Sequence, residues 1–356
     1  MFESLGFQSL TAPEAAIWFG LVLGLAFGAM AQISRFCLRR GLVVGPDRRA
    51  ALGVWALALA VALLGTQAAV AMGFASFDGH RFLAGDLPVV AVLLGGLMFG
   101  AGMVLTRGCL SRLTVLGASG NLRALTVLLV FAVVAHAALK GVLAPVRVGL
   151  GSVTVPLGEA ASLAALPGGT LFWTGLLAVS ALTLVWRSGA PLRDLGFGVG
   201  IGLLVPLGWV GTGYVLYDDF DPIALQSLSF TLPAAETLFW GVASTAIAPT
   251  FGVGLLGGTV AGAAVAAILS GAFRWESFES PAQTGRYSAG AVLMGFGGVL
   301  AGGCTLGAGL SGVATLGVSA LLALGAIALG AMATDAALRR SDERQATQSS
   351  APIAAE

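Results

Sequence analysis

Three cysteines are the residues of this chain whose presence is hardest to explain by packing alone. They are Cys37, Cys109 and Cys304, and no two of them are close in sequence. An odd number of separated cysteines provides neither a disulfide framework nor a zinc site. A lone thiol in apolar surroundings usually packs as a small hydrophobic residue. Its other use is as a weak donor and acceptor toward a soft, polarizable ligand.

Glycine-rich breaks surround two of these thiols, in "RGCLSRL" and "GGCTLGAGLSG". Each break ends one helix and begins another. Irregular backbone at membrane depth is tolerated only where protein or a water-filled cavity surrounds it. Glycine lets the backbone approach a ligand, and the free N–H groups at a helix start favour an anion. We therefore expect a substrate-binding set made of Cys37, Cys109, Cys304, Gly108, Gly303 and Thr305.

The breaks share a spacing that indicates an internal repeat. A glycine lies nine residues before each cysteine, at Gly28, Gly100 and Gly295. The segment "LGFGVGIGLLVPLGW" fits the same frame with Trp209 in the cysteine position. The pattern predicts four related breaks, of which three carry a thiol.

Composition places these breaks in a membrane. Of the 356 residues, 57% are hydrophobic and only 10% are charged, whereas soluble domains are about 25% charged. A net charge of +1 argues against a nucleic-acid partner. Strand signals are absent from the apolar runs, so we expect an all-α polytopic membrane protein. About nine transmembrane helices are predicted, at 15–33, 50–73, 88–106, 122–144, 168–186, 193–213, 254–272, 287–303 and 313–337. A further apolar piece, 236–252, is too short to cross and is expected to be re-entrant or interfacial.

Charge predicts the orientation. The first connection, "SRFCLRRGLVVGPDRR", carries five arginines and one aspartate, and basic connections stay in the cytoplasm. Nine spans then place the N-terminus outside the bacterial inner membrane and the C-terminus in the cytoplasm. Residues 1–338 are expected to form one transport domain, in which halves 15–145 and 193–338 are inverted about a connecting helix at 168–187. Broken segments of such halves meet near the bilayer midplane. The polar tail, 339–356, is expected to be disordered.

Thiols at such breaks favour a sulfur-containing anion. A thiol can donate S–H to a terminal sulfur and release it easily, because the bond is weak, and conduction needs such weak binding. Thiosulfate fits this chemistry. Such a path needs separate thiols, since a close pair could oxidise to a disulfide and close it.

The segments "SRFCLRRG", "GAGMVLTRGCLSRL" and "GGVLAGGCTLGAGLSG" resemble the cysteine motifs of the YeeE/YedE sulfur-transport family. The resemblance extends over residues 15–337. It implies an hourglass-shaped bundle with inverted halves that imports thiosulfate, holding it by S–H···S bonds and short-helix dipoles. Carried over here, the relay thiols are Cys37, Cys109 and Cys304. It also implies a cytoplasmic sulfurtransferase partner of the TusA type, and for some members selenium metabolism.

Other interpretations stay open. A membrane thiol–disulfide oxidoreductase would need the cysteines to pair across units, leaving one unpaired. A sequence-blind anion channel would not need the thiols at all. His136, inside the fourth span, is a weaker candidate for proton coupling. No enzyme activity, metal or cofactor is expected, and the cation-free sequence around Cys304 favours neutral thiols.

Overall fold

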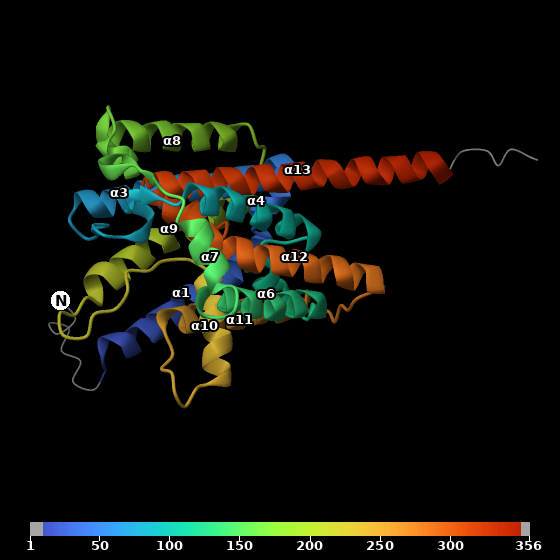
Figure 1. Cartoon of the computed structure of the whole chain (residues 1–356), viewed down its shortest axis with the longest axis horizontal. Coiled ribbons are helices and arrows are strands. Elements are labelled where there is room, and N and C mark those ends of the chain that lie inside the picture. Colours follow the sequence, from blue (N-terminus) through green and yellow to red (C-terminus); the bar gives the residue numbers. More distant parts are fainter. Residues whose placement is uncertain (1–9, 350–356) are drawn as a thin grey trace, which may run out of the picture.

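The computed structural model describes residues 10–349 and is built almost entirely of helices (Figure 1). The first group of helices precedes residue 155: α1 (Ala12–Ser34), α2 (Leu38–Leu42), α3 (Arg48–Ala71), η2 (Arg81–Leu83), α4 (Val89–Leu105), α5 (Leu110–Ala118), α6 (Leu122–Lys140) and α7 (Ala144–Gly151). The second group follows: η3 (Gly158–Ala161), η4 (Leu163–Ala165), α8 (Gly169–Trp186), α9 (Leu192–Val210), η5 (Gly211–Val215), α10 (Thr231–Val242), α11 (Phe251–Leu269), α12 (Pro281–Leu300), η6 (Gly307–Gly312) and α13 (Val318–Ser349). Two short strands, β1 (Asp86–Leu87) and β2 (Val155–Pro156), pair antiparallel.

The all-α membrane fold is confirmed, with one difference in the number of spans. Within residues 10–349, eight helical segments are long and apolar enough to cross a membrane. The eighth of the nine predicted spans, 287–303, lies on α12 and does not reach this hydropathy. The first turns of α12 carry Gln283, Thr284 and Arg286, which lower its mean hydropathy. α12 nevertheless packs against α4 and α6 inside the bundle.

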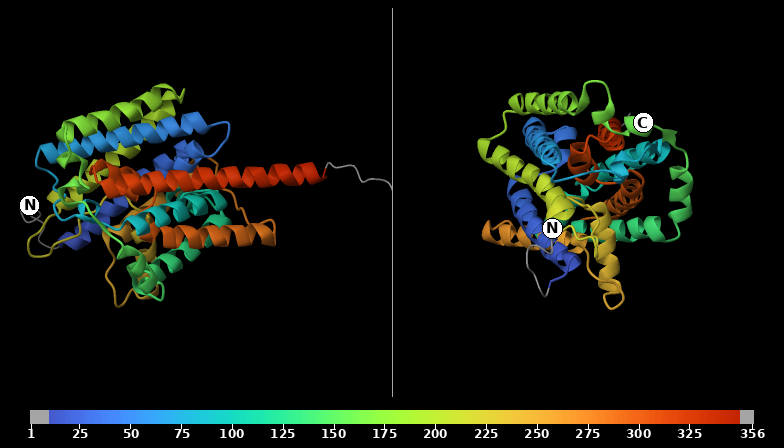
Figure 2. Two further views of the ribbon diagram at one scale, coloured as in Figure 1. Left: turned by 45° about the horizontal axis from the view of Figure 1, so that its top comes forward. Right: turned by 90° about the vertical axis from the view of Figure 1, so that its left-hand side faces the viewer.

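The helix contacts exchange between the two parts of the chain. α1 packs on α11 while α9 packs on α3, and α4 packs on α13 while α12 packs on α6. α1 also meets α9, and α4 meets α12. These helix pairs map onto one another when each helix is exchanged with a counterpart: α1 with α9, α3 with α11, α4 with α12 and α6 with α13. Two related halves would produce this pattern, and their opposite insertion stays a prediction. Figure 2 shows α8 at the periphery of the bundle, where it packs on α3.

Glycines bring the long helices into backbone contact. A Cβ at Gly24 of α1 would lie 2.2 Å from the Leu255 carbonyl oxygen, and one at Gly258 of α11 would lie 2.1 Å from the Leu21 carbonyl oxygen. Neither approach is possible for a larger residue. Small residues at such interfaces let van der Waals packing hold membrane helices together.

The residue two positions before each cysteine has a left-handed backbone. The φ angles are 53° at Arg35, 59° at Arg107 and 73° at Gly302. An αL residue ends a helix, because it turns the chain away from the helical path. Each cysteine then stands just before a short helix: α2, α5 and η6. Three of the four predicted breaks therefore share one local geometry.

The fourth predicted break, at Trp209, is wrong. α9 continues through Trp209 to Val210 and then widens into the π-helical turn η5. No αL residue precedes Trp209, and the hydroxyl of Thr212 bonds back to the Gly208 carbonyl at 2.9 Å, along the helix. Shared glycine spacing does not by itself stop a helix.

Two further boundaries differ from prediction. The apolar piece predicted at 236–252 corresponds to α10, which ends at Val242, seven residues before Pro249. The 12 residues of α10 span about 18 Å, so this helix is too short to cross, as expected. The tail is helical as far as Ser349, because α13 continues beyond residue 338. The ion pair between Arg339 and Asp335, one turn apart, supports that extension. The rest of the predicted disordered tail, 350–356, lies outside the described residues.

Candidate functional site

Cys37 and Cys109 form a buried pair of thiols. Their Sγ atoms lie 3.5 Å apart, and the Cys109 Sγ also lies 3.4 Å from the Ser111 hydroxyl. Each cysteine occupies the position before its short helix without a side-chain capping bond. The thiols are therefore free to face each other, and the expectation that all three would be kept separate is wrong for this pair.

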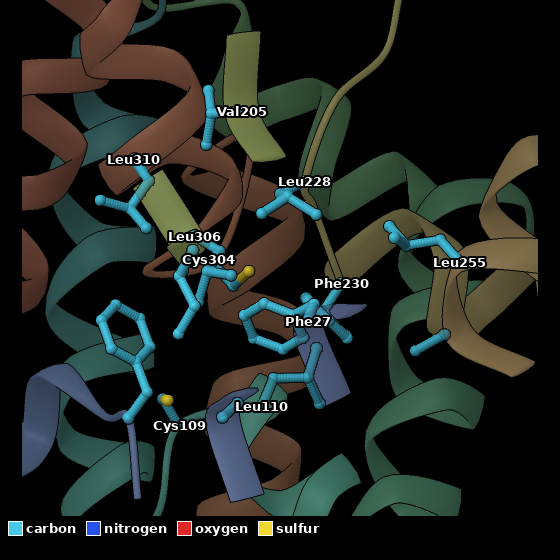
Figure 3. Packing of buried hydrophobic residues seen from close by; sticks show 14 of the residues in the cluster. Phe27, Cys109, Leu110, Val205, Leu228, Phe230, Leu255, Cys304, Leu306 and Leu310 are labelled. Carbon is cyan, nitrogen blue, oxygen red and sulfur yellow. The ribbon is translucent and has the colours of Figure 1, made fainter. Parts of the chain in front are cut away.

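Cys304 lies apart from that pair, in the opposite half of the chain. Its Sγ accepts the backbone N–H of Gly307 at 3.4 Å, and its side chain is fully buried. Figure 3 shows Cys304 and Cys109 in one buried cluster, with Leu306 beside Cys304 and Leu110 beside Cys109. Apolar side chains thus enclose both thiols, which excludes bulk water from them.

A hollow of about 350 Å³ reaches Cys37. Its polar wall contains Arg35, Arg40, Asp47 and Asp194. Arg40 pairs with Asp47 at 3.1 Å and donates to the Arg35 carbonyl at 3.0 Å. We call this space the inner hollow, since it adjoins the arginine-rich first connection.

A second hollow, of about 410 Å³, lies on the other side of the thiols. His80 and Arg81 line it from the connection between α3 and α4, with Trp209, Ser229 and Gly307 opposite. Gly307 in its wall donates to Cys304, so the third thiol lies behind the lining of this space. We call it the outer hollow. Arg81 forms no ion pair among the described residues, and its guanidinium lies 4.9 Å from the ring centre of Phe82.

His80 is neutral in this hollow. Burial, followed by the positive charge of Arg81, lowers the pKa of His80 to about 4. Its Nδ1 accepts the backbone N–H of Phe82 at 3.4 Å. A neutral ring that accepts at Nδ1 carries its proton on Nε2. His80 can therefore donate to an anion without adding a charge.

Three buried donors have no hydrogen-bond partner within the described part of the chain: Trp209 Nε1 and Ser229 Oγ, in residues that line the outer hollow, and Thr305 Oγ1, in the residue that follows Cys304. Neighbouring hydroxyls are engaged, since Ser311 donates to the Leu228 carbonyl and Ser227 to the Val205 carbonyl, each at 2.7 Å. Buried donors without partners are rare and call for an explanation. A bound oxyanion would provide their missing acceptor.

The other predicted residues have backbone roles. The Gly108 carbonyl accepts the Thr106 hydroxyl at 3.1 Å, and a Cβ at Gly303 would lie 2.7 Å from the Ala308 nitrogen. His136 stacks on Phe239 of α10 at a ring separation of 4.4 Å. Among the described residues no cluster of three or more His, Cys, Asp or Glu side chains could hold a metal ion.

Sequence reasoning missed His80 and Arg81. It treated the surroundings of Cys304 as free of cations, but Arg81 lines the same hollow as Gly307, whose N–H donates to that thiol. The available signal was the adjacent His-Arg pair within a connection that has little other basic character. Nothing in the local sequence joins positions 80 and 304, because only the folded chain brings them together.

Comparison with known proteins identifies the family of this chain. A family model described as sulphur transport matches residues 33–333. A thiosulfate transporter of Spirochaeta thermophila is 28% identical over 309 residues, covering 82% of this chain and 89% of that protein. A thiosulfate transporter of Escherichia coli is 26% identical over 318 residues, covering 82% of this chain and 85% of that protein.

Proposed function

Because the chain belongs to the sulphur-transport family, we propose that it imports thiosulfate through the bacterial inner membrane along its three cysteines. The chain is a multi-pass membrane protein whose relatives are named as transporters and not as enzymes. The identity of the anion and the passage along the thiols are the proposed parts.

One observation carries the proposal: two hollows approach the three thiols from opposite ends of the same helix. Pro191 and Asp194, at the start of α9, line the inner hollow, and Trp209, near its end, lines the outer hollow. The 19 residues of α9 span about 28 Å, close to the thickness of a bilayer core. Cys37 lines one hollow and contacts Cys109, and Gly307 in the wall of the other hollow bonds to Cys304, which supports a barrier that contains the three thiols.

The outer hollow fits the oxygen end of thiosulfate. Arg81 supplies the positive charge, while His80 Nε2, Trp209 Nε1 and Ser229 Oγ supply neutral donors. Charge-assisted hydrogen bonds are the stronger ones, but a single cation keeps binding weak enough for release. The terminal sulfur then faces Cys304.

The thiols carry the anion through the apolar barrier without a covalent step. Each S–H donates to the terminal sulfur and is left behind as the next thiol takes over. After Cys304, the anion meets Cys109 and then Cys37, whose Sγ atoms are 3.5 Å apart. Cys37 lines the inner hollow, where Arg35 and Arg40 receive the anion.

Orientation follows the arginines. The basic first connection lies at the inner hollow, which we assign to the cytoplasm. The N-terminus is then outside and the C-terminus inside. A TusA-like sulfurtransferase would take the anion at that face and keep its free concentration low. Facilitated diffusion with consumption inside would then need no coupling ion.

A thiol–disulfide oxidoreductase is the alternative that the close Cys37–Cys109 pair favours. It leaves Cys304 and the outer donors without a role, and its activity differs from that named for the relatives. Import of another sulfur or selenium anion would use the same geometry.

The test is growth of a host that lacks sulfate uptake on thiosulfate as sole sulfur source. Wild type is expected to restore growth, and Cys304→Ala and Cys109→Ala are expected to fail at equal membrane abundance. Thr259→Ala is the matched control, because its buried hydroxyl only bonds to the Leu255 carbonyl within α11. Failure of wild type would exclude thiosulfate import. Rescue by Cys37→Ala, Cys109→Ala and Cys304→Ala alike would exclude the thiol path. Competition by selenium-containing analogues tests the breadth of the substrate.

A further inference from the structure

A third hollow, of about 720 Å³, lies on the side of the bundle between α1 and α11. The two helices run parallel, since Gly20, Gly24 and Gly28 meet Phe251, Leu255 and Thr259 in the same order. Both helices therefore end on the side of the inner hollow. Among the described residues that line this space there is neither a cysteine nor a carboxylate.

Three guanidinium groups converge on this hollow from different segments. Arg35 caps the end of α1, Arg112 lies in α5, and Arg193 lies in the first turn of α9. Arg112 donates to the Ala31 carbonyl at 3.3 Å, and Arg193 lies 5.9 Å from the ring centre of Phe197. None of the three is in an ion pair with a described side chain. Their combined positive charge is therefore not neutralised by carboxylates of the protein.

The rest of the wall is apolar and faces outward. Ile33, Val265 and Leu269 are 41%, 54% and 82% exposed. The same exposed strip continues along α1 through Val22 and Trp18. In a membrane protein such side chains face acyl chains. At the edge of the hollow, the buried Oε1 of Gln32 has no hydrogen-bond partner among the described residues.

We propose that this hollow binds one anionic phospholipid, with its phosphodiester at Arg35, Arg112 and Arg193 and an acyl chain along Ile33, Val265 and Leu269. Arginine binds phosphate through parallel N–H···O bonds. Basic pockets between membrane helices on the cytoplasmic side are typical sites for anionic lipid headgroups. A headgroup hydroxyl, as in phosphatidylglycerol, would donate to Gln32 Oε1.

Arg35 and Ile33 line both this hollow and the inner hollow, but the rest of the lining separates this site from the transport path. The inner hollow is lined by Cys37 and the outer hollow by Gly307, which bonds to Cys304, but here the polar end meets an apolar wall that faces the membrane. A small dianion would leave that wall in contact with water. A phospholipid fits both the basic end and the apolar wall, because its phosphate and its acyl chains are attached to the same glycerol.

Native mass spectrometry of the full-length protein in detergent tests the site. The protein is titrated with phosphatidylglycerol or with phosphatidylcholine, and the bound fraction is compared between wild type and variants. Wild type is expected to retain phosphatidylglycerol at least about tenfold better than the zwitterionic lipid, which corresponds to about 1.4 kcal/mol. Arg193→Gln and the double variant Arg35→Gln/Arg193→Gln are expected to lose this preference stepwise.

Arg187→Gln is the matched control, because Arg187 is an exposed arginine at the end of α8 that does not line the hollow. Equal retention of both lipids, or an unchanged preference in the double variant, would overturn the proposal. Displacement of the lipid by millimolar thiosulfate or inorganic phosphate would assign the hollow to small anions instead. The measurement reads lipid retention without any transport, so it stands whatever the outcome of the growth test.

Discussion

The two ends of the thiol path differ in number of thiols, in charge and in hydrogen bonding. At the outer end a single thiol, Cys304, accepts a backbone N–H, and one cation, Arg81, stands among neutral donors. At the inner end two thiols lie 3.5 Å apart beside a hollow that contains Arg35 and Arg40. The outer end is suited to selecting an anion, because its donors without partners define an acceptor shape. The inner end is suited to passing it on, since a second thiol is already in contact.

This difference leads us to expect unequal tolerance of substitution. An anion that loses Cys304 has no second thiol at hand, whereas one that loses Cys37 still meets Cys109. The inner arginines also offer several positions to a departing anion, while Arg81 offers one.

Substitution of Cys304 should have the largest effect. Cys304→Ser is expected to lower thiosulfate uptake into proteoliposomes by about tenfold or more, because a hydroxyl is a poorer partner for a terminal sulfur. Cys37→Ser is expected to lower uptake by about threefold, or about 0.7 kcal/mol. Uptake of radiolabelled thiosulfate, normalised to reconstituted protein, measures both. Equal losses would remove the asymmetry between the two ends.

The sequence predicted the membrane fold and the three breaks, because both depend on local signals. Long apolar runs identify spans, and the glycine spacing shared by the three cysteines indicated the breaks. The same reasoning failed at Trp209, where the glycine spacing is shared but the backbone stays helical. Glycine permits a break without requiring one.

The site was predictable only in part. The three cysteines were predicted as site residues because thiols at helix breaks are unusual in a membrane protein. The pairing of Cys37 with Cys109 joins residues 72 positions apart, and Arg81 shares the outer hollow with Gly307, which bonds to Cys304 in the opposite half of the chain. Neither relation leaves a periodic trace in the sequence. Such contacts depend on how helices cross, which local propensity does not encode.

Loss of the outer charge should have the next largest effect. Arg81→Gln is expected to raise the KM for thiosulfate by about five- to tenfold with little change in kcat, because the guanidinium acts on binding and encounter. Arg81→Lys, which keeps the charge, should recover most of the affinity. Uptake at several salt concentrations should depend less on ionic strength in Arg81→Gln than in wild type. An unchanged KM in Arg81→Gln would show that capture does not depend on this cation.

Removal of single neutral donors should have a smaller effect. Trp209→Phe removes Nε1–H and keeps the ring, and Ser229→Ala removes Oγ; each is expected to raise KM by about two- to fourfold, in the range of one hydrogen bond. Ser311→Ala is the comparison, because the Ser311 hydroxyl already bonds to the Leu228 carbonyl at 2.7 Å. That variant should lower the unfolding temperature and leave KM near the wild-type value. If Ser311→Ala affected KM as much as Ser229→Ala, the distinction between free and engaged donors would fail.

Acidification is expected to act through His80 at the outer end and to produce the smallest effect. The chain has two histidines, of which His80 lines the outer hollow, where its pKa is lowered to about 4 from an ordinary value of 6.5. Between those values the unfolded chain binds a proton that the folded chain does not, so stability falls as pH drops from 6.5 toward 4. The His80→Asn variant keeps an acceptor for the Phe82 N–H but does not titrate, so its unfolding temperature should fall less between pH 7 and pH 5 than that of wild type. The hollow is open to water, which limits the difference to a few degrees. Carboxylates titrate equally in both proteins and cancel in the comparison. If both unfolding temperatures fell equally, His80 would have an ordinary pKa in the folded protein. The His80 ring would then carry a positive charge below pH 6.5 and would not be the neutral donor assigned to the outer end.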